Sequence, residues 1–427
     1  MRARSFLSAS LLLLTLNNVG AALGYVFQGL MARTLSTADF GLMNSLFALG
    51  GLLALPAGVY ASLLQRQWAE RTNAGRAAEA DRAWRALLAA ASAACAAGAV
   101  VALALTTLFA WWLRTNNFTA VIVTIVATAC GMAFSFATPL ATARQWFGAL
   151  GVASALGGLL RLALAWLGIH LGTPLSGAIA ATAAGGGVLA LIAWVRAGRT
   201  PWRELPFREL LPARREWIAP ALAAVTLWLL CGADLFVIRR VREPHAAGVF
   251  AQVLVLARII FFLIGPMTAV IFPKAATALA TPSARPRLVR HALALGALVL
   301  IPAATLLAWQ APFAIALLRG SSDPEAVALL RLAAWCLLPL SLCQLVIPAL
   351  FARRQERVLL EFTLLAGLLP LGLAIFRADL RQAFLVEGAV GLLLLAFAAL
   401  RLRPKAEAGT ESSARSMQAL DSPEPAS

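Results

Sequence analysis

Apolar residues run through this chain in long blocks, which short clusters of charged and turn-forming residues separate. A helix needs about 20 consecutive apolar residues to cross the hydrocarbon core of a bilayer. Twelve blocks reach that length, and each predicts one transmembrane helix. Their approximate ranges are 6–31, 40–64, 87–112, 119–141, 148–169, 174–195, 217–238, 246–272, 289–309, 326–350, 358–376 and 382–400. The pattern therefore predicts an all-α polytopic membrane protein.

The composition agrees with this pattern and restricts the function. The 427 residues are 61% hydrophobic and only 13% charged, whereas soluble proteins carry about 25% charged residues. In a soluble chain the formal net charge of +17 would indicate nucleic-acid binding. Here the arginines cluster in the gaps between apolar blocks, where they indicate membrane orientation. We therefore predict no nucleic-acid partner.

The gaps between blocks carry positive charge unevenly. With the N-terminus in the cytoplasm, 25 lysines and arginines fall in cytoplasmic segments and 8 in external ones, and 3 lie inside blocks. Basic residues concentrate in cytoplasmic loops of membrane proteins. The distribution predicts twelve helices with both termini in the cytoplasm.

The longest basic gap divides the chain into two similar halves. Residues 196–217 hold six arginines and three prolines. We predict an N-terminal six-helix lobe, a cytoplasmic linker between the lobes, a C-terminal six-helix lobe and a disordered cytoplasmic tail of small polar residues. Their ranges are 1–200, 201–216, 217–402 and 403–427.

The two halves share a spacing of residues. Arg33 precedes Gly41 by eight residues, and Arg240 precedes Gly248 by eight. Each pair lies in a short external turn after the first helix of its half. Chance is one explanation, and two six-helix repeats are the other. Transporters are often built from such repeats, with the substrate site between them.

Polar residues at membrane depth identify a candidate cavity, because an ionisable group that faces lipid costs several kcal/mol. Asp234 and Arg258 lie at depths that differ by roughly 6 Å, so they pair or share one cavity. Our hypothesis is that Arg258 offers positive charge to an anionic head group, while Asp234 orients it or exchanges a proton. The alternative is a purely structural ion pair.

Other polar residues are weaker candidates for the same cavity. Arg161 lies inside the fifth predicted helix, where snorkelling or helix packing is the alternative. Four amides lie on the first two helices, where hydrogen bonds between helices are the alternative. These amides are Asn17, Asn18, Gln28 and Asn44.

Charged residues near the external ends of helices receive a simpler interpretation. Arg33, Arg239 and Arg240 lie at the external mouth and are interpreted as solvated loop charges. Glu387 lies near an external helix end, where it is expected to reach water.

Motifs for chemistry or cofactor binding are missing from the sequence. It contains no P-loop, no Ser/His/Asp constellation and no His/Glu metal motif. The five cysteines all fall in apolar blocks, which favours packing over disulfides or metal ligation. The external gaps are short, whereas a membrane glycosyltransferase or polymerase needs a substantial catalytic loop outside. We therefore predict a transporter with no catalytic residues, no cofactor and no metal, rather than an enzyme.

Three stretches resemble bacterial polysaccharide-biosynthesis flippases of the multidrug/oligosaccharidyl-lipid/polysaccharide exporter superfamily. Residues 27–58 (FQGLMARTLSTADFGLMNSLFALGGLLALPAG) contain the expected Gln28, the Leu35-Ser36 turn, the Phe40-Gly41 pair and Pro56. Residues 144–166 resemble an inner loop that enters the fifth helix. Residues 232–276, which include Asp234, resemble the corresponding part of the second half.

The resemblance implies a fold and a function. The fold is a V of two six-helix bundles around a central, often cationic cavity. The function is alternating-access transport of undecaprenyl-pyrophosphate-linked oligosaccharide across the bacterial inner membrane, for lipopolysaccharide or exopolysaccharide. The implied partners are this lipid-linked oligosaccharide, membrane lipids and, as an open question, other polysaccharide-assembly proteins. Two alternatives stay open: a drug/cation exporter of the same superfamily, which needs an acidic and aromatic cavity, and a non-transporting component of an assembly complex.

Overall fold

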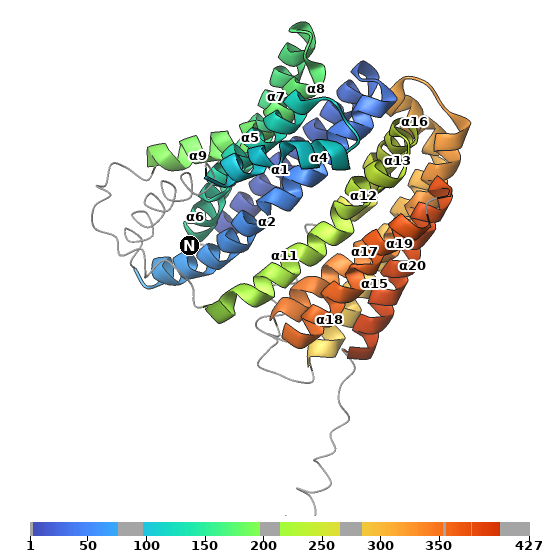
Figure 1. Cartoon of the computed structure of the whole chain (residues 1–427). Coiled ribbons are helices and arrows are strands. Elements are labelled where there is room, and N and C mark those ends of the chain that lie inside the picture. The colour runs from blue at the N-terminus through green and yellow to red at the C-terminus, as the bar shows by residue number, and fades with distance from the viewer. Residues whose placement is uncertain are drawn as a thin grey trace, which may run out of the picture.

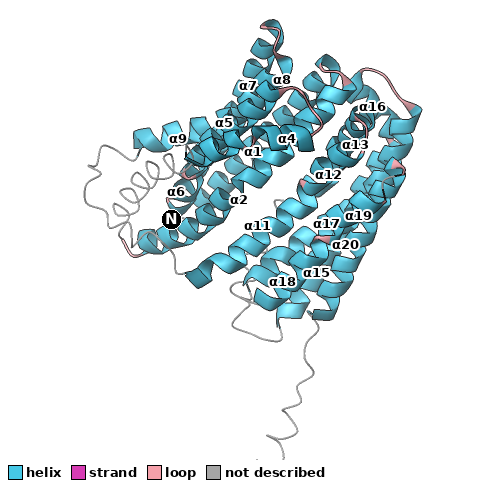
Figure 2. Ribbon diagram, viewed as in Figure 1, coloured by secondary structure: helices cyan, strands magenta, loops and turns pink. Residues whose placement is uncertain are grey.

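The computed structural model describes residues 3–75, 97–196, 214–264, 284–352, 356–376 and 378–401. These residues form helices and turns and contain no strand (Figure 2). Most of the predicted linker (201–216) and the whole predicted tail (403–427) lie outside the described residues.

All twelve predicted blocks fall on helices, although the third and eighth blocks extend into residues that are not described. Nine helical segments of the described chain are long and apolar enough to cross a membrane, and the bent pair of α11 and α12 makes up to ten. The helices of the first half are α1 (Ala3–Thr34), α2 (Thr37–Asn73), α4 (Thr106–Trp112), α5 (Phe118–Ser135), α6 (Ala137–Ala143), α7 (Phe147–His170), α8 (Pro174–Ala180), η1 (Ala181–Ala183) and α9 (Ala184–Arg196).

The second half begins with the short helix η2 (Arg214–Trp217). It continues with α11 (Ile218–Cys231), α12 (Ala233–Val241), α13 (Pro244–Leu263), α15 (Ala284–Trp309), α16 (Ala311–Arg319), α17 (Pro324–Ala352), α18 (Glu356–Ala366), α19 (Leu368–Ile375) and α20 (Leu380–Arg401). The predicted all-α polytopic fold is thus confirmed.

Local sequence explains where several of these helices begin and end. Ser36 caps α2, because its Oγ accepts a hydrogen bond from the backbone N of Asp39 at 3.1 Å. Asn117 caps α5 in the same way through the backbone N of Ala120. Gly320 ends α16 with a φ of 84°, a left-handed conformation that glycine adopts without steric cost.

The helices form two bundles, which lie side by side (Figure 1). In the first bundle, α7 packs against α1, α8 and α9, and α2 packs against α5 and α6. In the second bundle, α17 packs against α13, α15 and α20, while α11 packs against α18 and α12 against α19. The bundles meet where α2 packs against α11, α12 and α13. This arrangement is the V of two helical bundles that the resemblance implies.

Two glycines mark a point of close contact between the bundles. A Cβ atom added to Gly41 of α2 would lie 2.7 Å from the Cα of Gly248 of α13. A Cβ atom added to Gly248 would lie 2.0 Å from the carbonyl oxygen of Thr37. Both positions therefore require glycine, since no side chain fits between the two backbones. We call this end of the molecule, with the turns after α1, α4 and α12, the closed end.

Candidate functional site

A cavity of about 560 Å³ lies between the two bundles. Side chains of α1, α2 and α7 line it from the first bundle, and side chains of α11, α12 and α13 line it from the second. The volume is typical of a site for a small organic ligand or for a head group. The cavity includes four of the predicted site residues, which are Arg161, Arg258, Gln28 and Asn44.

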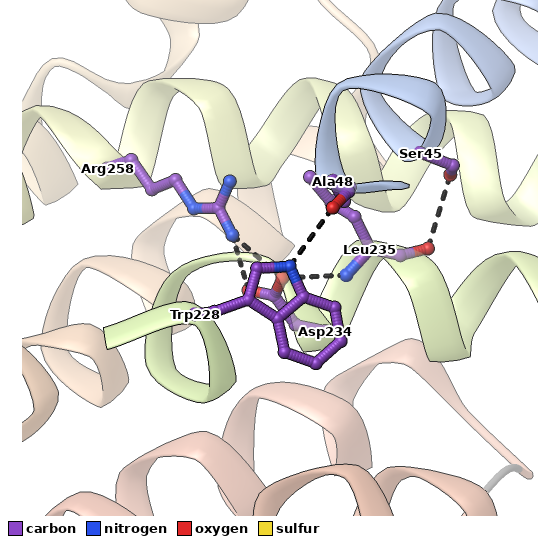
Figure 3. A network of polar contacts seen from close by, with 6 residues as sticks. All are labelled: Ser45, Ala48, Trp228, Asp234, Leu235 and Arg258. Atoms are coloured by element: carbon purple, nitrogen blue, oxygen red, sulfur yellow. Dashed lines mark hydrogen bonds and ion pairs between the residues drawn. The ribbon is translucent and has the colours of Figure 1, made fainter. Parts of the chain in front are cut away.

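A break in the helix places Asp234 beside the cavity. Gly232 separates α11 from α12, and the two helices are bent by 49° at this point. Asp234 lies in the first turn of α12, where its Oδ1 accepts a hydrogen bond from the backbone N of Leu235 at 2.7 Å (Figure 3). The negative carboxylate is thus held at a helix N-terminus, where the helix dipole favours it.

Arg258 of α13 pairs with this carboxylate. Its Nη2 donates to both Oδ1 and Oδ2 of Asp234 at 2.7 Å (Figure 3). The Asp234 side chain is 3% exposed and does not line the cavity, whereas the Arg258 side chain is 14% exposed and does. Within the described chain, Nε and Nη1 of Arg258 make no hydrogen bond. One side of the guanidinium therefore holds Asp234, and the other side remains available to a ligand.

Arg161 of α7 lies in a different environment. Its guanidinium carbon stands 3.9 Å from the ring centroid of Phe27 and 5.3 Å from that of Phe47. Such cation–π contacts hold a cation without neutralising its charge. Among the described residues no carboxylate pairs with Arg161, and its buried Nε has no hydrogen-bond partner. Arg161 therefore brings an uncompensated positive charge to the cavity.

The two predicted amides of the cavity contact each other. Gln28 of α1 donates from Nε2 to Oδ1 of Asn44 of α2 at 3.4 Å, and Asn44 donates from Nδ2 to the carbonyl oxygen of Phe40 at 3.0 Å. Oε1 of Gln28 is buried and has no hydrogen-bond partner in the described chain. Both alternatives in the sequence analysis hold at once, since the amides line the cavity and bond between helices.

The other two predicted amides lie elsewhere on α1. Oδ1 of Asn17 accepts a hydrogen bond from Oγ of Ser154 at 3.1 Å, which ties α1 to α7. Asn18 is exposed. Neither residue lines this cavity.

Two expectations about charged residues were wrong. Glu387 was expected to reach water, yet it is 1% exposed. The reason is close packing of α20 on α17, where Gly388 contacts Cys336 and Gly391 contacts the backbone of Leu340. Arg239 was interpreted as a solvated loop charge, yet it is 4% exposed, because it donates to carbonyl oxygens of the first bundle.

Aromatic residues of the cavity were missed in the sequence analysis. Tyr25, Phe47 and Trp228 line it, and Nε1 of Trp228 donates across the bundles to the carbonyl oxygen of Ala48 at 3.0 Å (Figure 3). A signal for Trp228 was present, because tryptophans of membrane proteins concentrate near helix ends and Trp228 lies well inside a predicted helix. Tyr25 and Phe47 carried no comparable signal.

The model of a family of polysaccharide biosynthesis proteins matches residues 30–328. The chain belongs to this family. The match begins in α1 and ends in α17, so it includes parts of both bundles and the cavity lining from α2 to α13, but not the lining residues of α1. A comparison with curated proteins finds no match.

Solved structures with the same fold are transporters and a flippase. An inward-facing multidrug resistance MATE family transporter of the MOP superfamily is 14% identical, with a TM-score of 0.69 and 96% of each chain covered. The lipid II flippase MurJ, in an inward closed conformation, is 11% identical, with a TM-score of 0.68, and the match covers 93% of this chain and 87% of that one.

A third similar structure is a MOP superfamily transporter from Pyrococcus furiosus, described as having a binding pocket of reverse polarity. It is 14% identical, with a TM-score of 0.66, and the match covers 92% of this chain and 95% of that one. At these identities the likeness is one of fold. This member of the polysaccharide biosynthesis family is therefore a multi-pass membrane protein with a transporter fold.

Proposed function

We propose that this protein is a flippase that moves undecaprenyl-pyrophosphate-linked oligosaccharide across the bacterial inner membrane for cell-surface polysaccharide biosynthesis. The observation that carries the proposal is Arg161, a guanidinium without a carboxylate partner in the described chain, which lines a cavity between two bundles. A buried positive charge of this kind favours an anionic ligand. Membership of a polysaccharide biosynthesis family and the fold shared with a lipid II flippase support the same substrate class.

The geometry suggests how the head group binds. The pyrophosphate meets Arg161 and the free Nη1 of Arg258, and Asp234 keeps the Arg258 guanidinium in position from behind. Guanidinium groups suit phosphate oxygens because they offer several donors in one plane. Tyr25 and Trp228 offer aromatic faces to the apolar faces of sugar rings. The lipid tail stays in the bilayer, and no covalent bond changes.

Transport then follows from the V of the two lobes, which we assign to residues 1–200 and 217–402. Both termini are cytoplasmic in this proposal, so the closed end faces outward and the structure is an inward-facing state. The substrate enters from the inner leaflet, and rocking of the bundles opens the closed end to the outer leaflet.

A drug/cation exporter of the same superfamily is the second candidate. The aromatic side chains of the cavity favour it, as do the several similar structures that are MATE transporters. The charge of the cavity opposes it, because no carboxylate lines the cavity among the described residues, whereas two arginines do.

Reconstituted vesicles test the proposal directly. The assay measures how fast a fluorescent undecaprenyl-pyrophosphate oligosaccharide crosses the membrane with wild-type protein, Arg161→Gln and the control Arg381→Gln. Loss of a hydrogen-bonded charge costs about 1.5–3 kcal/mol, so we expect Arg161→Gln to lower the initial rate by about 10- to 100-fold. Arg381 lies at the closed end, away from the cavity, and its variant should retain the wild-type rate.

Three outcomes would overturn the proposal. The first is a wild-type rate for folded Arg161→Gln. The second is transport of an organic cation without transport of the lipid. The third is normal delivery of lipid-linked sugar to the outer leaflet in cells without the protein, which would favour a non-transporting assembly component. Arg161→Met, which also removes the charge, replaces Arg161→Gln if the glutamine variant does not fold.

A further inference from the structure

The two bundles place equivalent sequence positions opposite each other. Gly41 and Gly248, which touch at the closed end, are 207 residues apart (248 − 41 = 207). Residues with this separation also line the cavity together. Six such pairs line it, which are Ala21 with Trp228, Gly24 with Cys231, Tyr25 with Gly232, Gln28 with Leu235, Ala48 with Val255, and Gly51 with Arg258. A constant offset of 207 residues at the glycine contact and in the cavity lining is what two structural repeats produce.

Two arginines with the same separation connect the bundles at the closed end. Arg33 of α1 donates from Nη2 to the carbonyl oxygen of Leu317 in α16 at 2.6 Å. Arg240 of α12 donates from Nη1 to the carbonyl oxygen of Trp111 in α4 at 3.1 Å. In one hydrogen bond the first bundle supplies the donor and the second bundle the acceptor. In the other hydrogen bond these roles are exchanged. The acceptors are 206 residues apart (317 − 111 = 206), so the two contacts are equivalent to within one residue.

The acceptors share a chemical feature. Both belong to the last turn of a short helix, where carbonyl oxygens lack the usual donor four residues further along. The carbonyl oxygen of Trp111 also accepts from the backbone N of Arg114 at 3.2 Å. The negative end of the helix dipole lies there, so a guanidinium is favoured. The Arg240 guanidinium also lies 3.8 Å from the centroid of the Trp111 ring, which adds a cation–π contact. Each bundle thus supplies the arginine that caps a helix of the other bundle.

We propose that Arg33 and Arg240 form a reciprocal latch, which holds this end of the molecule closed and releases both hydrogen bonds together when the bundles separate. The bundles move as rigid bodies, and the two contacts occupy equivalent positions of the repeats, so a motion that breaks one also breaks the other. Carbonyl acceptors suit a reversible contact, because water replaces a carbonyl oxygen at a low net cost. An ion pair with a carboxylate would hold the end more tightly.

Arg239 reinforces one side of this latch. It donates from Nε to the carbonyl oxygen of Leu113 at 2.9 Å and from Nη1 to that of Ala38 at 3.3 Å. The residue 207 positions before Arg239 is Ala32, whose side chain has no hydrogen-bond donor. The reciprocal part of the latch is therefore the pair of Arg33 and Arg240, while Arg239 is an addition of the second half.

Spin-label distance measurements on the full chain in lipid nanodiscs test the latch. The labels are attached at Asn116→Cys and Ser322→Cys, two exposed turn residues on opposite bundles at the closed end, after replacement of the five native cysteines by alanine. The variants are Arg33→Gln, Arg240→Gln and the double variant. The control is Arg381→Gln, which removes the same charge from the first turn of α20, next to Ala378, whose carbonyl oxygen accepts from Arg242 of the turn after α12.

A cation near a helix C-terminus contributes about 0.3–1 kcal/mol. We therefore expect each single variant to raise the ratio of long to short label distances by about 2- to 5-fold, and the double variant to raise it by the product of the two factors. The control should leave the ratio unchanged.

Three results would overturn the latch: no change in either single variant, a change in only one of them, or an equal change in Arg381→Gln. Arg33→Lys and Arg240→Lys serve if a glutamine variant misfolds, with smaller increases expected. The measurement uses no substrate, so its outcome is independent of the proposed function, which the vesicle assay decides.

Discussion

Arginines at the closed end and arginines in the cavity differ in what their donors contact. At the closed end, Arg239 donates to three carbonyl oxygens, and Arg33 and Arg240 each donate to one across the bundles. In the cavity, Arg161 lies on aromatic rings, and Arg258 uses one of its nitrogens on Asp234. At the closed end, arginine side chains therefore hold backbone carbonyl groups. In the cavity, they keep hydrogen-bond donors available to a ligand.

The partners of each guanidinium indicate whether the arginine stabilises the structure or is available to bind a ligand. A guanidinium that donates to a carbonyl oxygen of the other bundle stabilises the contact between the bundles. A guanidinium with unused donors beside a cavity gains a charge-assisted hydrogen bond when an anion arrives. We therefore expect substitutions at the closed end to change conformation, and substitutions in the cavity to change substrate transport.

The largest expected effect comes from removing Asp234, because Arg258 then loses the carboxylate that accepts its hydrogen bonds. Breaking one partner of a buried ion pair destabilises a protein strongly, so Asp234→Ala should lower the free energy of unfolding by about 3 kcal/mol. Thermal unfolding in detergent measures this loss. The double variant Asp234→Ala/Arg258→Ala should lose less than Asp234→Ala alone. An equal or greater loss would show that the pair contributes packing rather than charge compensation.

A smaller effect is expected from Gly248→Ala, which places a Cβ atom 2.0 Å from the carbonyl oxygen of Thr37. Overpacking of this kind costs about 1–3 kcal/mol, and separation of the bundles at the closed end relieves it. The label distances across this end should therefore lengthen. Gly58→Ala is the matched control, since Gly58 also lies inside a helix and nothing would approach its Cβ within 4 Å. Equal label distances in the two variants would contradict the interpretation that the contact between Gly41 and Gly248 keeps this end closed.

The smallest of these effects concerns the cavity volume. Gly24 lines the cavity, and a Cβ atom there would meet nothing within 4 Å. Gly24→Leu should fill part of the space and lower the rate of lipid transport at least about tenfold, with little change in thermal stability. Gly29→Leu is the control, because Gly29 lies on the same helix, has open space around its Cβ and does not line the cavity. A rate loss of equal size in both variants would show that the helix, rather than the cavity, was affected.

The sequence predicted the fold well, because long apolar blocks leave a chain in a membrane almost no choice but helix. It also placed Asp234 and Arg258 at depths that differ by roughly 6 Å, close enough to pair, and the structure pairs them at 2.7 Å. Depth along a helix follows directly from residue number, whereas the direction of a side chain around the helix does not. Depth also matters, because Gln28 and Asn44 line the cavity, whereas Asn17 and Asn18 lie about one helical turn before Ala21, where the lining on α1 begins.

Glu387 and Arg239 show where prediction from depth fails. Both lie near helix ends, where water is usually within reach, yet both are buried. Close helix packing at Gly388 covers Glu387, and the meeting of the two bundles covers Arg239. Each burial depends on a neighbour that is distant in sequence, so no local pattern reports it.

The sequence alone determined the class of this protein, its helices, its division into halves and the shared spacing of Arg33 with Gly41 and of Arg240 with Gly248. These properties depend on composition and on distance along one chain. The tertiary structure decided which partner each guanidinium group contacts. The partner depends on which carbonyl, carboxylate or ring lies within a few ångströms, and that group is often distant in sequence. The two equivalent arginines become a latch only when the bundles meet.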